Sequence, residues 1–395
     1  MTMKLEAAST LPEDADGASL VGRVWRPYHK GPSVVTIRRG RVIDITARGT
    51  PTVSMLCESE DPAGKLAGLM GEDIGAVADV LANSSEASRD VAKSWFLSPI
   101  DLQAVKAAGV TFAQSMIERV IEEQARGSAE KAHAVRAEIT AIIGADLSQL
   151  KPGSPQAMEL KAALVAKGAW SQYLEVGIGP DAEIFTKAPV LASVGTGADI
   201  GLHPISTWNN PEPEIVLAAA STGRIVGAAL GNDVNLRDVE GRSALLLGKA
   251  KDNNASAAIG PFLRLFDRHF SLDDVRKAEV ALSVAGEDGF TLEGSSNMAR
   301  ISRDPADLIA AMMGRHHQYP DGAALYLGTM FAPVKDRDAP GKGFTHKIGD
   351  IVSISTPRLG RLTNRVRLST ECAPWSYGIA ALMANLARRK MVGER

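Results

Sequence analysis

Three carboxylates in the middle of the chain have the spacing of a metal site. Glu212 and Glu214 are alternate residues of a β-like run, so their side chains project from one face of a strand. If Thr222-Gly223 is a two-residue hairpin loop, Asp233 lies directly opposite Glu212. Carboxylate oxygens are the ligands that Mg2+, Mn2+ and Ca2+ prefer. The pattern therefore predicts that the three carboxylates bind one divalent ion, with Mg2+ preferred over Mn2+ or Ca2+. The alternative is that the glutamates lie on a solvated strand face.

The residues that follow these carboxylates form a longer motif. Residues 233–238 read Asp-Val-Asn-Leu-Arg-Asp, and a Gly-Lys at 248–249 and a Gly-Pro at 260–261 come after them. In this order the motifs resemble the core of the fumarylacetoacetate hydrolase family. Further segments that resemble the family pattern lie at 185–189, 328–329, 347–350 and 360–364. The resemblance covers residues 109–370 and implies a mixed β-roll, a magnesium site and a homodimer or higher homo-oligomer.

One segment departs from the hydrolases of this family that cleave carbon-carbon bonds. Those enzymes carry a His-Glu pair on a lid, where the histidine activates water, and the corresponding residues 109–118 contain no histidine here. This segment, a long helical insertion at 128–170 and residues 314–320 resemble the 2-keto-3-deoxypentonate dehydratase branch. That branch implies a lyase that converts 2-keto-3-deoxy-D-xylonate or its arabinonate epimer to 2,5-dioxopentanoate (α-ketoglutarate semialdehyde).

Dehydration of a 2-keto acid suits an ion held by carboxylates. The substrate chelates the ion through a carboxylate oxygen and the keto oxygen, and the ion stabilises the enolate that forms when a C3 proton leaves. Loss of the C4 hydroxyl then completes a β-elimination. The chain is therefore expected to be a hydro-lyase.

The resemblance also implies roles for individual side chains. Lys249 is expected to place a fixed positive charge near the substrate carboxylate or the developing enolate. Lys187, Arg237 and Thr329 are the candidate substrate-binding residues, although Arg237 is expected to order the site through Asp238 or a neighbouring loop more than to contact substrate.

The proton chemistry is assigned to the segment that closes over the substrate in this family. A helix predicted at 114–127 carries Ser115, Glu118 and Glu122 along one stripe. Burial under a lid raises the pKa of a carboxyl group, which suits proton transfer from C3 to the departing hydroxyl. Glu118, the nearer carboxylate to the metal loop, is the predicted acid-base residue, with Ser115 beside it.

Two other functions stay open at this point. The first is hydrolysis of an acylpyruvate or another diketo acid, with Glu118 as the base. The second is a catalytically silent protein that only binds small keto acids. Product analysis separates them, because a hydrolase releases pyruvate, a lyase releases the semialdehyde and a silent binder turns over neither substrate.

The elements around the site indicate an α+β fold in two parts. Residues 1–100 alternate β-like runs at 33–37 and 41–45 with a helix at 76–82, which predicts a small N-terminal α+β domain. Residues 101–395 are the predicted catalytic domain, with the helical insertion followed by short strands and glycine-rich turns. Its expected strands are 278–285, 290–293, 323–328, 350–356 and 360–368, and further helices are expected at 304–313 and 377–390.

Composition excludes several classes of protein. The chain of 395 residues has 44 basic and 46 acidic side chains, so no summed positive field favours nucleic acid. No apolar run approaches the roughly 18 residues of a membrane span, and the N-terminus lacks a signal pattern. Cys57 and Cys372 alone make no disulfide framework. We expect a cytoplasmic protein that binds a small 2-keto acid and neither nucleic acid nor membrane.

Overall fold

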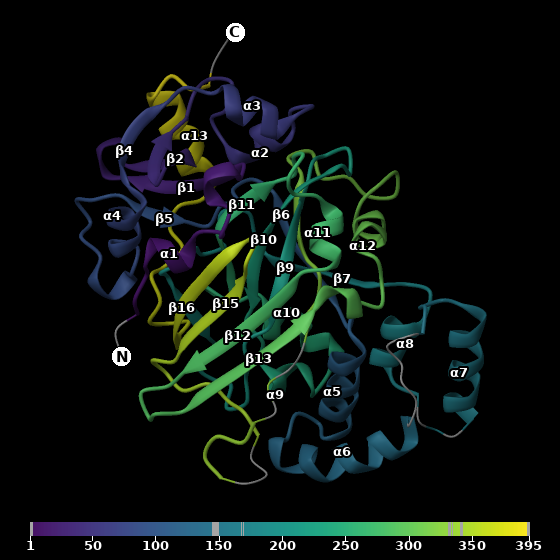
Figure 1. The fold of residues 1–395 in the computed structure, drawn as a ribbon. Coiled ribbons are helices and arrows are strands. Elements are labelled where there is room, and N and C mark those ends of the chain that lie inside the picture. The colour runs from purple at the N-terminus through teal and green to yellow at the C-terminus, as the bar shows by residue number, and fades with distance from the viewer. Residues whose placement is uncertain are drawn as a thin grey trace.

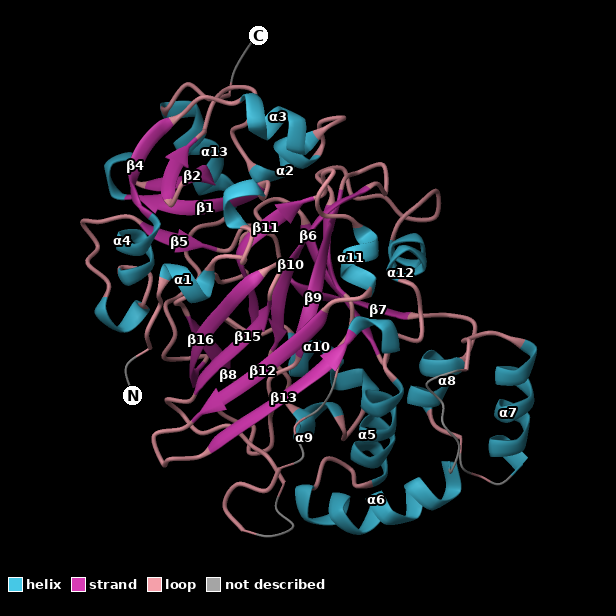
Figure 2. Cartoon of the chain, viewed as in Figure 1, coloured by secondary structure: helices cyan, strands magenta, loops and turns pink. Residues whose placement is uncertain are grey.

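The computed structural model describes residues 3–143, 150–166, 168, 170–330, 333, 335–339 and 343–392. The described strands form two sheets, and the helices lie around their ends and edges (Figure 2). A group of helices extends from one end of the sheets (Figure 1). The predicted α+β class is confirmed.

The larger sheet runs through both predicted parts of the chain. Its order among the described residues is β4-β3-β2-β1-β11-β10-β9-β14-β6-β7, with β5 paired to β1. Its strands are β1 (Leu20–Arg26), β2 (Gly31–Arg38), β3 (Arg41–Asp44), β4 (Glu72–Ala76), β5 (Trp95–Leu97), β6 (Ala104–Gly109), β7 (Glu183–Ala188), β9 (Pro213–Ala219), β10 (Ile225–Asp233), β11 (Ala257–Leu265) and β14 (Ala323–Tyr326).

The smaller sheet packs on the larger one through a shared apolar core. Its order is β13-β12-β15-β16-β8, and in Figure 1 most of its strands lie in front of β9 and β10. The expected strands at 278–285, 290–293, 350–356 and 360–368 all belong to it. Its strands are β8 (Asp199–Leu202), β12 (Glu279–Ala285), β13 (Thr291–Asn297), β15 (Ile351–Thr356) and β16 (Gly360–Leu368).

Strands β9 and β10 are buried on both faces, which explains their nearly unbroken apolar sequences. Ile215 faces the core shared with the smaller sheet. Val216 faces a second core, which also contains Tyr326. Glu214 and Glu212 have the same parity as Val216, so their side chains leave the hairpin on this second face.

The N-terminal strands extend the larger sheet. β1 pairs antiparallel with β11, with Val21 opposite Leu263, and the buried Arg264 of β11 lies 2.6 Å from Asp14. The predicted strands and helix of this part are present as β2, β3 and α4 (Val77–Ala82). The other helices that pack here are α1 (Ala7–Thr10), α2 (Val53–Cys57), α3 (Pro62–Gly68) and, from the far end of the chain, α13 (Ile379–Arg388). The domain boundary at residue 100 stays a prediction.

The helices at the end of the sheets form a small unit with its own apolar core. They are α5 (Ala113–Gln124), α6 (Ala129–Ile143), α7 (Pro155–Ala166) and α8 (Gln172–Ile178), and their core includes Met116, Val120, Leu164 and Leu174. Helices α6 and α7 lie in the predicted insertion, of which residues 144–149, 167 and 169 fall outside the described part. In Figure 1, α5 is the helix of this unit nearest the sheets.

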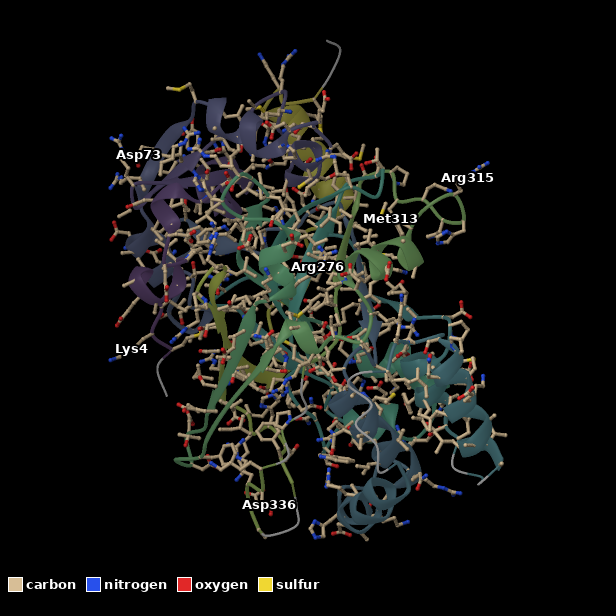
Figure 3. All side chains as sticks on the ribbon, turned by 45° about the vertical axis from the view of Figure 1, so that its right-hand side comes forward. Lys4, Asp73, Arg276, Met313, Arg315 and Asp336 are labelled. Atoms are coloured by element: carbon tan, nitrogen blue, oxygen red, sulfur yellow. The ribbon has the colours of Figure 1, made fainter. Side chains whose placement is uncertain are left out.

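Four further helices connect the strands of the two sheets. They are α9 (Arg237–Glu240), α10 (Leu247–Lys251), α11 (Leu272–Arg276) and α12 (Pro305–Met312). The loop after α12, which contributed to the resemblance, lies at the surface, and Figure 3 shows its Arg315 pointing outward. A search of the described residues finds no helix with the length and apolar character of a membrane span.

Candidate metal centre

The hairpin of β9 and β10 brings the three predicted ligands together. Gly231 pairs with Glu214, and the backbone N–H of Asp233 donates to the carbonyl oxygen of Glu212 at 3.1 Å. Directly opposite residues of an antiparallel pair share a face, so Asp233 and the two glutamates converge. The pairing predicted from the sequence is confirmed.

The loop that joins the two strands differs from the prediction. The N–H of Ala220 donates to the carbonyl oxygen of Arg224 at 2.9 Å, which leaves three residues in the loop instead of two. Gly223, at φ 84°, supplies the left-handed conformation that a three-residue hairpin loop needs. A register shift at Val226 then inserts one extra residue on β10. The bulge offsets the longer loop, and the predicted pairing at the ligands is restored.

The three carboxylates are buried and close enough to share one ion. Glu212, Glu214 and Asp233 are each at most 2% exposed, and they offer oxygen atoms within 4.8 Å of one another. Glu214 also accepts a hydrogen bond from the N–H of Gly328 at 2.7 Å. Burial, with help from the two neighbouring carboxylates, raises the pKa of Glu214 well above its usual value. A buried set of oxygen donors fits Mg2+, Mn2+ or Ca2+.

Two lysines compensate the negative charge of these ligands. Lys251 Nζ lies 2.5 Å from Glu212 Oε2 and 3.1 Å from Asp233 Oδ2. Lys187 Nζ lies 2.7 Å from Asp233 Oδ1. Burial opposes ionisation of Asp233, but the two ammonium groups outweigh it and hold the pKa of this carboxyl below its usual value.

Lys251 takes the place that the sequence-based prediction gave to Lys249. Lys249 is exposed on α10, whereas Lys251 is 2% exposed and contacts two ligands. Two steps along a helix turn a side chain by about 200°. Only one of the two lysines can therefore face the carboxylates, and the structure places Lys251 there, which corrects the predicted placement of Lys249.

Lys187 supports Asp233 from inside the protein. It is fully buried, and its ammonium group donates to the carbonyl oxygens of Val234 and Lys251 and to the hydroxyl of Ser256. It does not line the cavity at the carboxylates. The geometry gives Lys187 a positioning contact in place of the predicted substrate contact.

Helix α5 reaches the metal centre with two side chains one turn apart. Ser115 and Arg119 line the cavity at the carboxylates. Ser115 is buried, and its hydroxyl donates to the carbonyl oxygen of Phe112 at 2.9 Å. Arg119 contacts Glu212 directly. The structure therefore brings Ser115 to the site as predicted, and it adds Arg119.

Glu118 and Arg237 lie outside this cavity and bind each other. Glu118 Oε2 is 3.0 Å from Arg237 Nη2 and 2.6 Å from Arg136 Nη2. Arg237 also lies 2.7 Å from Glu122 and stacks over the ring of Trp208 at 4.3 Å. These contacts join α5, α6 and α9. They place Glu118 away from the cavity, which corrects its predicted placement, and they suit the ordering role predicted for Arg237.

The cavity beside the carboxylates has a volume of about 20 Å3. That space holds one ion or one water molecule. A five-carbon sugar acid is larger than this space. The lining residues are Ala108, Gly109, Val110, Ser115, Arg119, Glu183, Phe185, Glu212, Glu214, Asp233, Glu240, Lys251 and Thr329.

Glu183 and Glu240 are cavity residues that the sequence analysis missed. Burial raises the pKa of Glu183, although Arg119 and Lys251 act in the opposite direction. Burial likewise raises the pKa of Glu240 to about 7. Glu240 lies 3.1 Å from Arg119, whereas the carboxylate of Glu183 has no hydrogen bond or ion pair among the described residues. Glu183 is therefore the carboxyl group of the cavity that is free to exchange a proton.

Simple periodicity would have found two of the missed residues. Glu183, Phe185 and Lys187 are alternate residues of β7, and such residues share a face. Arg119 follows Ser115 by four positions on α5, which places both on one stripe of the helix.

One family model matches the part of the chain that contains these carboxylates, and two relatives of known name each match about half of the chain. The family model described as fumarylacetoacetate (FAA) hydrolase C-terminal matches residues 184–367. The 2-dehydro-3-deoxy-D-arabinonate dehydratase of Saccharolobus solfataricus is 31% identical over 185 residues, which is 47% of this chain and 58% of that protein. The probable 2-keto-3-deoxyxylonate dehydratase of Haloferax volcanii is 28% identical over 194 residues, 49% of this chain and 63% of that protein. The matches thus span less than two thirds of either relative.

A solved structure shows the same fold over most of the chain. It is 2-keto-3-deoxy-D-arabinonate dehydratase complexed with magnesium and 2,5-dioxopentanoate, and it aligns with a TM-score of 0.58 and 20% sequence identity. The alignment covers 88% of this chain and 99% of that chain. The predicted fold, a mixed β-roll with a helical insertion and an N-terminal α+β region, is confirmed.

Proposed function

We propose that the protein is a magnesium-dependent lyase that dehydrates a 2-keto-3-deoxypentonate to 2,5-dioxopentanoate, in line with the match of residues 184–367 to the fumarylacetoacetate (FAA) hydrolase C-terminal model. One observation carries the proposal: three buried carboxylates of one hairpin converge beside a free carboxyl group, Glu183. The names of the two relatives and the magnesium complex of the similar structure support the choice of substrate and ion. Mn2+ and Ca2+ are the alternative ions, and a homo-oligomer stays a prediction.

The residues of the site divide the reaction between charge and proton transfer. Glu212, Glu214 and Asp233 would hold the ion, which supplies a Lewis acid at the keto oxygen of a 2-keto acid. Lys251 keeps a positive charge beside two of these ligands. Thr329 lies on the cavity wall, where its hydroxyl suits a contact with the substrate carboxylate.

Glu183 is our candidate for the proton transfer, in place of Glu118. As a carboxylate it takes the C3 proton, and the electron pair of the C3–H bond forms the new C3–C4 double bond. The same proton then goes to the C4 hydroxyl, which leaves as water, and the product of this step is the 2-keto acid with a C3–C4 double bond. Transfer of a C5 proton to C3, followed by protonation of the resulting C5 enol at C4 as its hydroxyl loses a proton, isomerises it to 2,5-dioxopentanoate with no net gain or loss of protons. A raised pKa brings a carboxyl group closer to the range that suits both directions of transfer.

Product analysis tests this function. Metal-loaded protein is incubated with 2-keto-3-deoxy-D-xylonate, with its arabinonate epimer and with an acylpyruvate. We expect 2,5-dioxopentanoate from at least one sugar acid and no pyruvate from any of the three. Efficient release of pyruvate from the acylpyruvate would favour the hydrolase, whose predicted base, Glu118, is bound to two arginines. Binding without turnover would favour a silent keto-acid binding protein.

A further inference from the structure

Arg119 binds three carboxylates that come from three different elements. Its Nη1 lies 2.6 Å from Glu122 of the same helix and 3.1 Å from Glu240 of α9. Its Nη2 contacts Oε1 of Glu212, which precedes β9. The residue is only 7% exposed, so these contacts replace water around its charge. The guanidinium therefore joins the helical unit to a ligand of the metal centre.

Both carboxylate oxygens of Glu212 are in contact with a cation. Arg119 contacts Oε1, and Lys251 lies 2.5 Å from Oε2. Each oxygen has a second lone pair for an ion, but the positive charge of that ion is repelled by both side chains. Arg119 also lines the small cavity that the ion must enter. The ion therefore gains affinity when one of the two cations moves away from Glu212.

Arg119 is the partner that can leave Glu212 at lower cost. After leaving, it still has Glu122 and Glu240 as partners, so its own buried charge stays compensated. Lys251 contacts both Glu212 and Asp233. If it moved away, two carboxylates would lose a cationic partner at the same time.

We propose that Arg119 is a positioning residue that occupies Glu212 in the metal-free protein and competes with the divalent ion for it. When the ion binds Glu212, the guanidinium of Arg119 leaves it, so ion binding also breaks this contact between α5 and Glu212. The proposal rests on the metal site of the proposed function.

Calorimetric titration of the metal-stripped, full-length protein with Mn2+ tests the exchange. Replacing Arg119 by methionine (Arg119→Met) should tighten Mn2+ binding by about tenfold or more, because a competing cation is lost. Arg119→Lys, which keeps the charge but cannot bridge the same carboxylates, should give an intermediate affinity. Arg136→Met is the matched control, since it removes a cation of the helical unit that binds Glu118 and not a ligand. The Mn2+ affinity of Arg136→Met should stay within about twofold of the wild-type value.

The outcomes separate this inference from the metal site itself. Unchanged or weaker Mn2+ binding in Arg119→Met and Arg119→Lys would show that Arg119 does not compete for Glu212, while the metal site would stand. If Arg119→Met does not fold, the Arg119→Lys titration decides alone. Absence of Mn2+ binding in the wild type, with the same result in Glu214→Gln, would overturn the metal site and this inference together.

Discussion

Glu118 and Glu183 show how the surroundings of a side chain set its role. Both are glutamates close to the metal centre. The carboxylate of Glu118 is bound by Arg136 and Arg237, and it does not line the cavity. Glu183 lines the cavity, and burial raises its pKa. The same residue type therefore supports the structure at one position and suits proton transfer at the other.

Replacing each glutamate by glutamine separates these roles. Glu183→Gln should lower turnover by about 10²-fold or more, the usual scale for a lost acid-base group, and should leave Mn2+ binding nearly unchanged. Glu118→Gln is the matched control: it should lower the free energy of unfolding by about 1–3 kcal/mol with a much smaller loss of turnover. Steady-state kinetics and urea unfolding measure both effects. A larger loss of turnover in Glu118→Gln would return the acid-base role to that residue.

The hairpin that carries the three carboxylates requires a glycine at position 231. Gly231 sits opposite Glu214, and the ring of Tyr326 lies over it, with its hydroxyl donating to the carbonyl oxygen of Ala258 at 2.7 Å. A Cβ at Gly231 would come within 2.4 Å of this ring and 2.6 Å of Val216. Close packing of the core against β10 therefore requires glycine at this position.

Gly231→Ala should destabilise the protein by about 1–3 kcal/mol, the usual cost of overpacking a core. Because the alanine would push against the side chains beside Glu214, it should also weaken Mn2+ binding. Gly248→Ala is the control, since a Cβ at that position of α10 meets no atom within 4 Å. Urea unfolding and Mn2+ titration of both variants measure the effects. Wild-type stability and affinity in Gly231→Ala would contradict the packing argument.

At the scale of the molecule, the larger sheet and its core cross the predicted domain boundary. β1 covers the edge of β11, and one apolar core contains Val21 and Leu56 from the first part together with Val216 and Tyr326 from the second. A sheet edge and an apolar surface that lose their cover tend to aggregate. We therefore expect residues 101–395 to depend on residues 1–100 for their solubility.

A chain reduced to residues 101–395 should aggregate, and co-expression with residues 1–100 as a separate chain should return it to solution. Size-exclusion chromatography and circular dichroism measure both results. A soluble, folded fragment that binds Mn2+ like the full chain would instead establish residue 100 as the boundary of an independent domain.

The convergence of the three candidate metal ligands was predictable because their placement follows from local rules. Alternation along a strand puts Glu212 and Glu214 on one face, and antiparallel pairing adds Asp233. The loop has one residue more than predicted, but the bulge at Val226 restores the predicted pairing at the carboxylates. Recognition of the family likewise used motifs that are contiguous in the chain. These features depend on residues close in sequence or joined by one hairpin.

The sequence by itself thus determined the α+β class, the resemblance to the fumarylacetoacetate hydrolase family and the convergence of the three carboxylates, whereas the tertiary structure decided what surrounds them. Which lysine of α10 faces the ligands depends on how that short helix is rotated against the hairpin. Arg119 and Glu183 reach the cavity because α5 and β7, far from the hairpin in the chain, pack around it. The carboxylate of Glu118 binds arginines of α6 and α9 and does not face the cavity. Side-chain periodicity assigns a residue to a face of its own element, but only packing between elements decides what that face meets.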